Sequence, residues 1–317
     1  MDIVITYVNG QDPEWQRDYE RYVSAPIEVK RFRDWGTLRY LMRGIEVNMP
    51  FIRKVHLVVA RESQVPAWLN RDVVNVVLHK DIIPAECLPT FNSNPIEMHL
   101  HRIEGLDEEY LYFNDDIFPI GPCKAEEFFK DGKGIIGLSK HFIAGNMFKK
   151  ICRNSDRLAR QALGMKNACR FLRPQHICAP MLRSQCEEVY EKLKPQILRS
   201  LSRVRSAENI TQYLFIDYMY LKGKVINKRQ EKSHLSVGFV TKGMIERTIA
   251  NPKRRLVCIN DVQMSDTRFK ERQEVLIRSL ENDSRTNPAS NYKGGGQRRE
   301  RQERECGKRA VSERDSS

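Results

Sequence analysis

Long hydrophobic runs are absent from this chain, and their absence excludes one class of protein. No stretch of about 18 residues is both apolar and uncharged, so we expect no transmembrane helix. The segment from Met1 to Ile5 has neither a basic start nor a cleavable apolar stretch, so we expect no signal peptide. The expected location is therefore cytoplasmic, either in solution or peripheral on the inner membrane.

Cysteine pairs with metal-binding spacing are also missing. The 317 residues include eight cysteines, none of them in a CxxC motif, which excludes zinc-ribbon and thioredoxin-like sites. Hydrophobic residues make up 40% of the chain, enough for a sizeable core without disulfide bonds. We therefore expect reduced thiols.

Negative charge is scarce relative to positive charge. Asp and Glu number 41 against 54 Lys and Arg, a formal net charge of +13. This imbalance fits an anionic substrate, an anionic membrane surface or nucleic acid. The chain has no zinc-finger spacing and no RNP-type aromatic motif, so we expect no nucleic-acid partner.

Short β-branched runs alternate with helical patterns in the first 120 residues. This order predicts an α/β fold with a mostly parallel sheet and helices on both faces. The predicted strands are 3–8, 55–59, 73–78 and 110–113, with a helix ending near Asn48 and a last strand over 254–261. The predicted units are an α/β core (1–139), a basic, mainly helical region covering the active-site edge (140–240), a return strand and helix (241–282) and a disordered charged tail (283–317).

Polar residues follow the predicted strands at their carboxyl ends, where open α/β sheets bind ligands. Asn114, Asp115 and Asp116 come directly after one strand, and Asp12 follows the first. Paired carboxylates are suitable ligands for Mg²⁺ or Mn²⁺, and Asp115 and Asp116 are therefore candidate metal ligands. The alternative is an Asx-rich turn without a ligand.

A polar loop leads into a predicted short helix near Pro95. Asn92 and Asn94 lie where helical N–H groups favour an anion. Glu97 and His101 are four residues apart and share one face if the helix continues. Either His101 is a catalytic or phosphate-binding residue held by Glu97, or it is a core histidine.

Basic residues supply the remaining candidates. His176 lies between two prolines, which predicts an extended segment. It is a base, a phosphate ligand or only a structural residue. Arg203 and Arg205 point the same way if their segment is a strand, and diverge if it is a helix. Arg39 and Arg43 form either a phosphate clamp or an ordinary surface stripe.

The order of these motifs resembles the Stealth family, the sugar-phosphate transferases of bacterial capsule synthesis, to which the animal lysosomal-enzyme N-acetylglucosamine-1-phosphotransferase is related. Residues 8–15 (VNGQDPEW) are similar to its opening block, and Asn9 stands where the family usually has Asp. The second block resembles 33–46, 64–70, 79–81, 91–101 and 112–116, with Trp35 in place of a polar residue. The segments 176–180 and 202–206 resemble the third block, and 258–261 the fourth.

The resemblance implies transfer of a hexose or N-acetylhexosamine 1-phosphate from a UDP-sugar to a glycan hydroxyl, on a nucleotide-sugar-transferase-like fold. It implies that Asp12, Asp115 and Asp116 hold a divalent ion or the donor, and that His176 or His101 acts as general base. It implies that arginines neutralise the donor diphosphate. The implied phosphate- and substrate-binding residues are Arg39, Arg43, Arg203, Arg205, Asn92, Asn94, Glu97, Asn114 and Asp261. The alternatives are a metal-dependent glycosyltransferase and a non-catalytic polysaccharide-binding protein.

Overall fold

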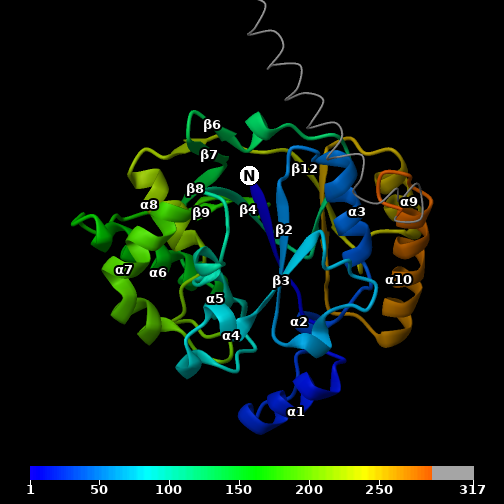
Figure 1. Cartoon of the computed structure of the whole chain (residues 1–317), viewed down its shortest axis with the longest axis horizontal. Helices are drawn as coiled ribbons and strands as arrows, with labels where there is room; N and C mark the ends of the chain where they lie inside the picture. The colour runs from blue at the N-terminus through cyan, green and yellow to red at the C-terminus, as the bar shows by residue number, and fades with distance from the viewer. Residues whose placement is uncertain (288–317) are drawn as a thin grey trace, which may run out of the picture.

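The computed structural model describes residues 1–287 and is built around one five-stranded sheet (Figure 1). The strand order is β10-β4-β1-β2-β3, and every neighbouring pair is parallel except β10 with β4. The strands are β1 (Asp2–Thr6), β2 (Lys54–Val59), β3 (Val74–Leu78), β4 (Glu109–Asn114) and β10 (Ala179–Leu182). The predicted mostly parallel α/β sheet is therefore confirmed.

The register of these strands brings their carboxyl ends to one edge. Thr6, the last residue of β1, lies opposite Val58 of β2 and Asn114 of β4. Ile3, Val4 and Ile5 are completely buried, as expected for a parallel sheet covered on both faces. The residues that follow these strands are consequently collected in one place.

Helices cover the sheet from two sides (Figure 1). One group consists of α3 (Leu38–Asn48), α9 (Lys242–Ala250) and α10 (Asp266–Glu281). The other group consists of α6 (Met147–Ala162), α7 (Arg183–Ser200) and α8 (Tyr213–Leu221). The predicted helix end at Asn48 is confirmed, and the Asn48 amide nitrogen donates to the carbonyl oxygens of Gly44 and Pro119, each at 3.0 Å.

Smaller elements complete the molecule. Three further sheets are formed by β12 (Lys232–Ser236), β13 (Leu256–Asn260) and β5 (Ile117–Pro119), by β11 (Val225–Asn227), β7 (Lys133–Ile136) and β6 (Phe129–Lys130), and by β8 (Leu138–His141) with β9 (Phe171–Pro174). The short helices are α1 (Pro13–Tyr22), α2 (Val29–Phe32), α4 (His79–Ile82) and α5 (Ser93–Glu97). The predicted last strand is therefore β13, which ends next to Asp261.

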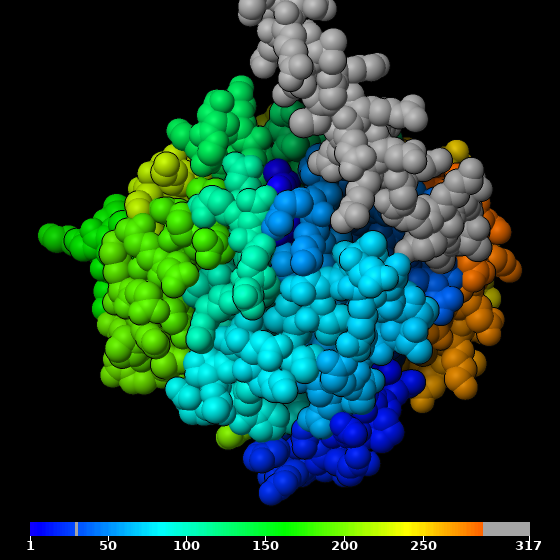
Figure 2. Space-filling model, in the orientation of Figure 1, coloured from blue at the N-terminus to red at the C-terminus, as the bar shows by residue number. Residues whose placement is uncertain are grey.

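A separate aromatic cluster anchors the first helix. Trp15 and Tyr19 of α1 pack on Phe32 and Phe91, with ring centres between 4.7 and 6.0 Å apart. Figure 2 shows the region of α1, in dark blue, projecting from the lower end of the molecule. The cluster therefore fastens this projection beside the sheet edge.

Two expectations from composition can be compared with residues 1–287. No helix in this part is long and apolar enough to cross a membrane. The seven cysteines within it are all free thiols.

The first residues of the expected tail pack on the fold. Arg285 donates to the carbonyl oxygen of Ile249 at 3.0 Å, and Thr286 is buried. The remainder of the expected tail, 288–317, lies outside the described residues.

Candidate active site

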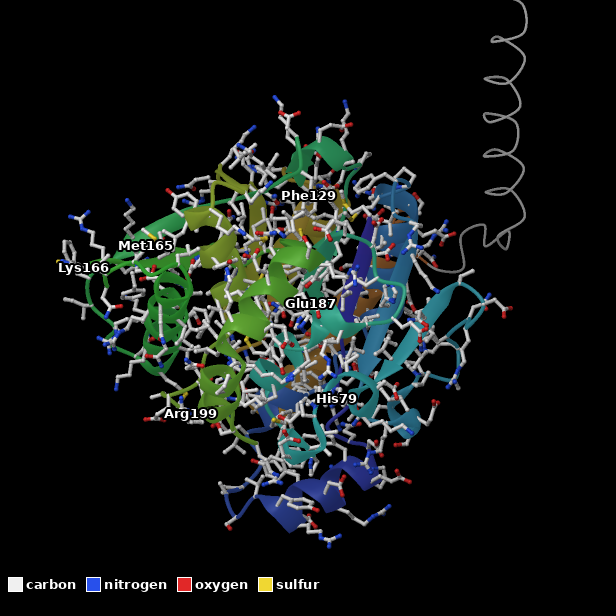
Figure 3. All side chains as sticks on the ribbon, turned by 60° about the vertical axis from the view of Figure 1, so that its left-hand side comes forward. His79, Phe129, Met165, Lys166, Glu187 and Arg199 are labelled. Carbon is white, nitrogen blue, oxygen red and sulfur yellow. The ribbon has the colours of Figure 1, made fainter. Side chains whose placement is uncertain are left out.

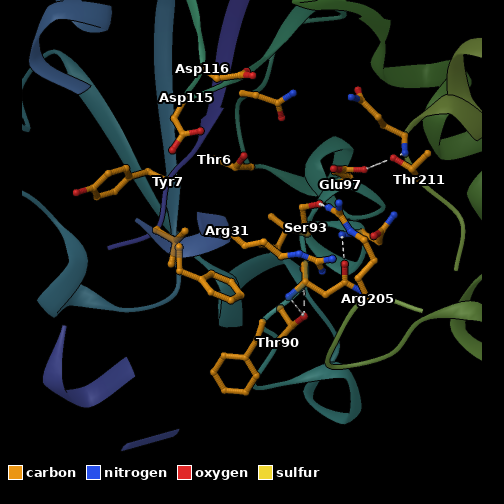
Figure 4. Close-up of a pocket in the computed structure, with 18 of the residues that line it drawn as sticks. Thr6, Tyr7, Arg31, Thr90, Ser93, Glu97, Asp115, Asp116, Arg205 and Thr211 are labelled. Carbon is orange, nitrogen blue, oxygen red and sulfur yellow. Dashed lines mark hydrogen bonds between the residues drawn. The ribbon is translucent and has the colours of Figure 1, made fainter. Parts of the chain in front are cut away.

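A cavity of about 420 Å³ lies where β1 and β4 end (Figure 4). β1 supplies Thr6 and the following Tyr7, β4 supplies Asn114, and β13 supplies Asn260 with the adjacent Asp261. Nine of the sequence-predicted site residues line it: Asn92, Asn94, Glu97, Asn114, Asp115, Asp116, His176, Arg205 and Asp261. The structure thus brings together residues that are up to 169 positions apart (261 minus 92).

Two adjacent carboxylates form the acidic end of the cavity (Figure 4). Asp115 is exposed towards the cavity, but the protein packed around it disfavours its charged form, and together with the charges of Asp116 and Asp34 this raises the pKa of Asp115 to about 7. Burial also raises the pKa of Asp116, but hydrogen bonds and the positive charge of its neighbours outweigh burial and lower it overall. The pair therefore has one ionised member at neutral pH and one that is easily protonated.

His176 is held by the lower-pKa member of this pair. Its Nε2 lies 3.0 Å from Asp116 Oδ2, and its side chain is 42% exposed. The Cys258 thiol donates to the same oxygen at 3.3 Å. When Nε2 carries the proton shared with Asp116, Nδ1 has a lone pair with which to accept a proton.

Arg205 and Arg31 supply positive charge to the cavity (Figure 4). Arg205 Nη2 donates to Ser93 Oγ at 2.7 Å, which fixes the guanidinium beside the start of α5. Arg31 Nε lies 2.7 Å from Glu28 Oε2. A diphosphate bound between these arginines and the acidic end would have its charge neutralised from one side.

Three predicted site residues also connect the wall of the cavity to the segment before α8. Asn92 Nδ2 donates to the carbonyl oxygen of Ser202 at 3.0 Å, and the Asn94 amide donates to the carbonyl of Ile210. Glu97 accepts from the Thr211 hydroxyl and from the Gln212 N–H. The expectation that Glu97 holds His101 is wrong, because its carboxylate is engaged at this other segment.

His101 lies outside the cavity. The helix α5 ends at Glu97 and is followed by a separate short 3₁₀ helix (Leu100–Arg102), so Glu97 and His101 do not share a helix face. His101 is buried, with its ring 4.9 Å from Tyr190 and 5.8 Å from Phe215. Burial, with the charge of neighbouring groups, lowers the pKa of His101 to about 3, as expected for a core histidine.

Arg203 and Asp12 interact with residues outside the cavity. Arg203 donates to the carbonyl of Leu88 at 3.3 Å and lies 5.2 Å from the Tyr22 ring centre, so it diverges from Arg205. Asp12 is the N-cap of α1, where it accepts from the Glu14 N–H at 3.0 Å. Neither side chain lines the cavity, so the structure does not bring them to Asp115.

Arg39 and Arg43 line a second cavity of about 370 Å³ between α3 and the strands β2 and β3. Arg39 lies 5.8 Å from the ring centre of Trp68. Arg43 Nη1 pairs with Glu46 Oε2 at 2.9 Å. A phosphate clamp formed by these arginines is therefore not part of the first cavity.

Three notable residues of the first cavity were not among the sequence-predicted ones. Arg31 lies two residues before the block that begins at Arg33, and this proximity was the available signal. The Tyr7 hydroxyl donates to Asp34 Oδ2 at 3.0 Å, and burial, with the charge of Asp34, raises the Tyr7 pKa. Burial and the charge of Arg61 lower the pKa of His79 to about 4, so His79 is neutral in the cavity wall. His79 lies in the segment 79–81, which resembles part of the second block, and Tyr7 lies near the carboxyl end of the first predicted strand, so their positions along the chain were the available signal.

The acidic end has the donor atoms that a divalent cation requires. Asp116 Oδ1 is buried and has no hydrogen-bond partner among residues 1–287. Ligand atoms of Asp116, His176 and Cys258 lie within 4.8 Å of one another. The carboxylates fit a hard cation such as Mg²⁺, and the mixed set fits a softer one.

Comparisons with known proteins identify the family of this chain. Residues 31–143 match the family model described as Stealth protein CR2, conserved region 2. The capsular polysaccharide phosphotransferase WcwK of Streptococcus pneumoniae is 30% identical over 303 residues, which cover 83% of this chain and 90% of that protein. The receptor polysaccharide phosphotransferase WefC of Streptococcus oralis is 32% identical over 265 residues, covering 71% and 79%.

One solved structure is also similar at the level of the chain trace. It is a crystal structure of the galactosyltransferase LgtC in complex with donor and acceptor sugar analogues. The TM-score is 0.38 and the sequence identity is 13%, with 86% of this chain and 95% of that chain covered.

Proposed function

This chain belongs to the Stealth family of polysaccharide phosphotransferases, and we propose that it transfers a sugar 1-phosphate from a UDP-sugar to a glycan hydroxyl. The glycan is a capsular or other surface polysaccharide, and the sugar is a hexose or an N-acetylhexosamine. The acceptor oxygen forms a bond to the β-phosphorus, the bond from that phosphorus to the α-phosphate oxygen breaks, and UMP leaves. The observation that carries this proposal is a single cavity holding Asp115, Asp116, Arg205 and His176.

Phosphoryl transfer of this kind requires mainly positioning and charge neutralisation. Arg205 and Arg31 are placed to bind diphosphate oxygens, and the hydrogen bond from Arg205 to Ser93 limits the motion of its guanidinium. Asn114 and Asp261 offer polar groups to the sugar or ribose hydroxyls at the acidic end. Asn92, Asn94 and Glu97 shape the opposite wall.

His176 is the proposed general base. Asp116 orients the ring through Nε2, so that Nδ1 can accept the proton of the acceptor hydroxyl. Its exposure lets a glycan hydroxyl approach. His176→Ala should lower kcat by on the order of 10²- to 10⁴-fold while donor binding persists; normal turnover in this variant would contradict the assignment.

A divalent cation is proposed at the acidic end, held by Asp115 and Asp116. Such an ion, when bound, would neutralise the donor diphosphate and stabilise the leaving UMP. Within the protein, Asp116 then serves both the cation and His176, which links the base to the donor site.

Phosphorus NMR tests the reaction directly. The full chain is incubated with a panel of UDP-sugars, a capsular oligosaccharide and Mg²⁺. A new phosphodiester resonance together with UMP is the expected result. Release of UDP with a phosphorus-free glycan would instead identify a metal-dependent glycosyltransferase, and binding without turnover of any donor would favour a polysaccharide-binding protein.

A further inference from the structure

The stretch from Lys140 to Arg173 concentrates the charge imbalance of the chain. It contains nine Lys and Arg residues and one acid, Asp156, a net charge of +8 (nine minus one) out of +13 for the whole sequence. Asp156 is buried and pairs with Arg160 at 3.0 Å, so it does not offset the exposed cations. This part of the molecule therefore presents a positive surface.

Large apolar side chains are exposed among these cations. Phe142 and Ile143, in the loop between β8 and α6, are 60% and 75% exposed, and Met147 at the start of α6 is 41% exposed. The Arg170 guanidinium lies 4.1 Å from the centre of the Phe142 ring. Adjacent exposed residues of this size mark an interaction surface on a globular protein.

We refer to Phe142, Ile143, Met147, Lys149, Lys150 and Arg170 as the basic apolar patch. The patch adjoins the active-site cavity, because Phe148 and Ile151 in the same turns of α6 line that cavity. Beyond the other end of α6, Met165 and Lys166 project from the margin of the molecule (Figure 3). The positive surface thus extends along α6 from the cavity outward.

We propose that the basic apolar patch docks the enzyme on an anionic phospholipid bilayer, with Phe142 and Ile143 among the headgroups. Cations flanking exposed apolar side chains are the combination that binds such a surface. An acidic glycan or nucleic acid would be attracted by the cations alone. It would gain little from the aliphatic side chains of Ile143 and Met147, whereas the apolar part of a lipid bilayer would remove them from water.

The consequence of docking for the acceptor rests on the proposed function. A docked patch places the cavity, with His176 in its wall, beside the membrane surface. The acceptor would then be a lipid-linked glycan whose terminal hydroxyl enters from the bilayer side. A soluble oligosaccharide with the same terminus remains a substrate, but without the advantage of co-localisation.

Vesicle sedimentation tests the docking. The full chain is mixed with vesicles of phosphatidylglycerol and phosphatidylcholine, or of phosphatidylcholine alone. We expect binding only to the anionic vesicles, weakened by added salt and reduced about tenfold or more in Phe142→Ser/Ile143→Ser and in Lys149→Gln/Lys150→Gln. Phe239→Ser is the matched control, since Phe239 is 77% exposed outside the patch and should bind like the unmodified protein.

Two results would overturn the proposal. One is equal vesicle binding by the Phe142→Ser/Ile143→Ser variant and the unmodified chain. The other is that the unmodified chain binds an acidic oligosaccharide but not vesicles, and that this variant binds the oligosaccharide equally well. Transfer to a soluble acceptor separates the two proposals: the patch variants should keep it, whereas failure of the proposed function would abolish it in every variant and leave vesicle binding intact.

Discussion

At the scale of single residues, the two carboxylates after β4 differ although they are adjacent in sequence. Asp116 has His176 and Cys258 as neighbours, which lower its pKa despite burial. For Asp115, desolvation and the charges of Asp116 and Asp34 act in the same direction, and its pKa rises to about 7. The sequence predicted both as metal ligands, but it had no means of predicting this difference, because His176 and Cys258 are distant along the chain.

The raised pKa of Asp115 predicts how cation binding depends on pH. Below about pH 7 a proton occupies Asp115 and competes with Mg²⁺, so affinity should fall by on the order of tenfold per pH unit. Calorimetric titration with Mg²⁺ between pH 5.5 and about 8.5 measures this. In Asp115→Asn the binding should be weak and nearly independent of pH; an unchanged pH profile in that variant would refute the assignment.

The arginines make a second prediction at this scale. Arg205 lines the active-site cavity, whereas Arg39 lines the second cavity. Arg205→Ala should lower kcat/KM by on the order of 10²-fold, since a charged partner of the diphosphate is removed. Arg39→Ala, the matched control, should remain within about twofold in the same assay. Equal losses in both variants would mean that the donor does not bind in the first cavity.

At the scale of elements, the sequence predicted those helices and strands whose position follows from apolar periodicity and strand composition. α3 and β13 fall where the apolar patterns placed them, because the buried residues of α3 recur at helical spacing and β13 is a short continuous apolar run that is buried on both faces. The continuation of α5 to His101 was wrong. The His99 ring bonds to the carbonyl of Pro95 at 2.6 Å and to the Tyr190 hydroxyl at 2.9 Å, and this tertiary contact accompanies the break in the helix.

Asn92 is one of three side chains that link α5 and the residue before it to the segment before α8. Asn92 Nδ2 donates to Ser202 O at 3.0 Å and to Asn209 Oδ1 at 2.9 Å, in a buried position. Asn92→Ala should lower the free energy of unfolding by about 1–3 kcal/mol, because two buried acceptors lose their donor.

The same substitution should also lower kcat/KM, because the segment that carries Arg205 loses a fixed point. Urea unfolding and steady-state kinetics measure the two effects. Asn70→Ala is the control: Asn70 is exposed and accepts from the Asp72 N–H at 2.9 Å, so its loss should change stability by less than about 1 kcal/mol. A larger effect at Asn70 than at Asn92 would contradict this account.

At the scale of the whole molecule, three buried histidines connect stability to pH. Burial lowers the pKa of His79 and His99 to about 4 and that of His101 to about 3. The unfolded chain binds protons at these residues below about pH 6.5, whereas the native state does not. Their stabilising contribution is therefore complete above pH 6.5 and is lost progressively as the pH falls toward 4.

Thermal unfolding should show this loss. The Tm should fall steadily from pH 6.5 to about 4.5, and the slope should be shallower in His101→Phe, where one of the three proton-linked groups is gone. Calorimetry at a series of pH values provides the measurement. A slope unaltered by that substitution would show that His101 is protonated in the native state.

The path of the chain through the sheet has an evolutionary consequence. After β4 and the acidic end, the chain leaves the central sheet and returns to it only through the antiparallel edge strand β10, just past His176. An edge strand pairs with one neighbour only, so a change in β10 leaves the pairing among β4, β1, β2 and β3 intact. We therefore expect relatives to differ in length between 138 and 178 while the register of the parallel strands is kept and α6 stays packed on α8.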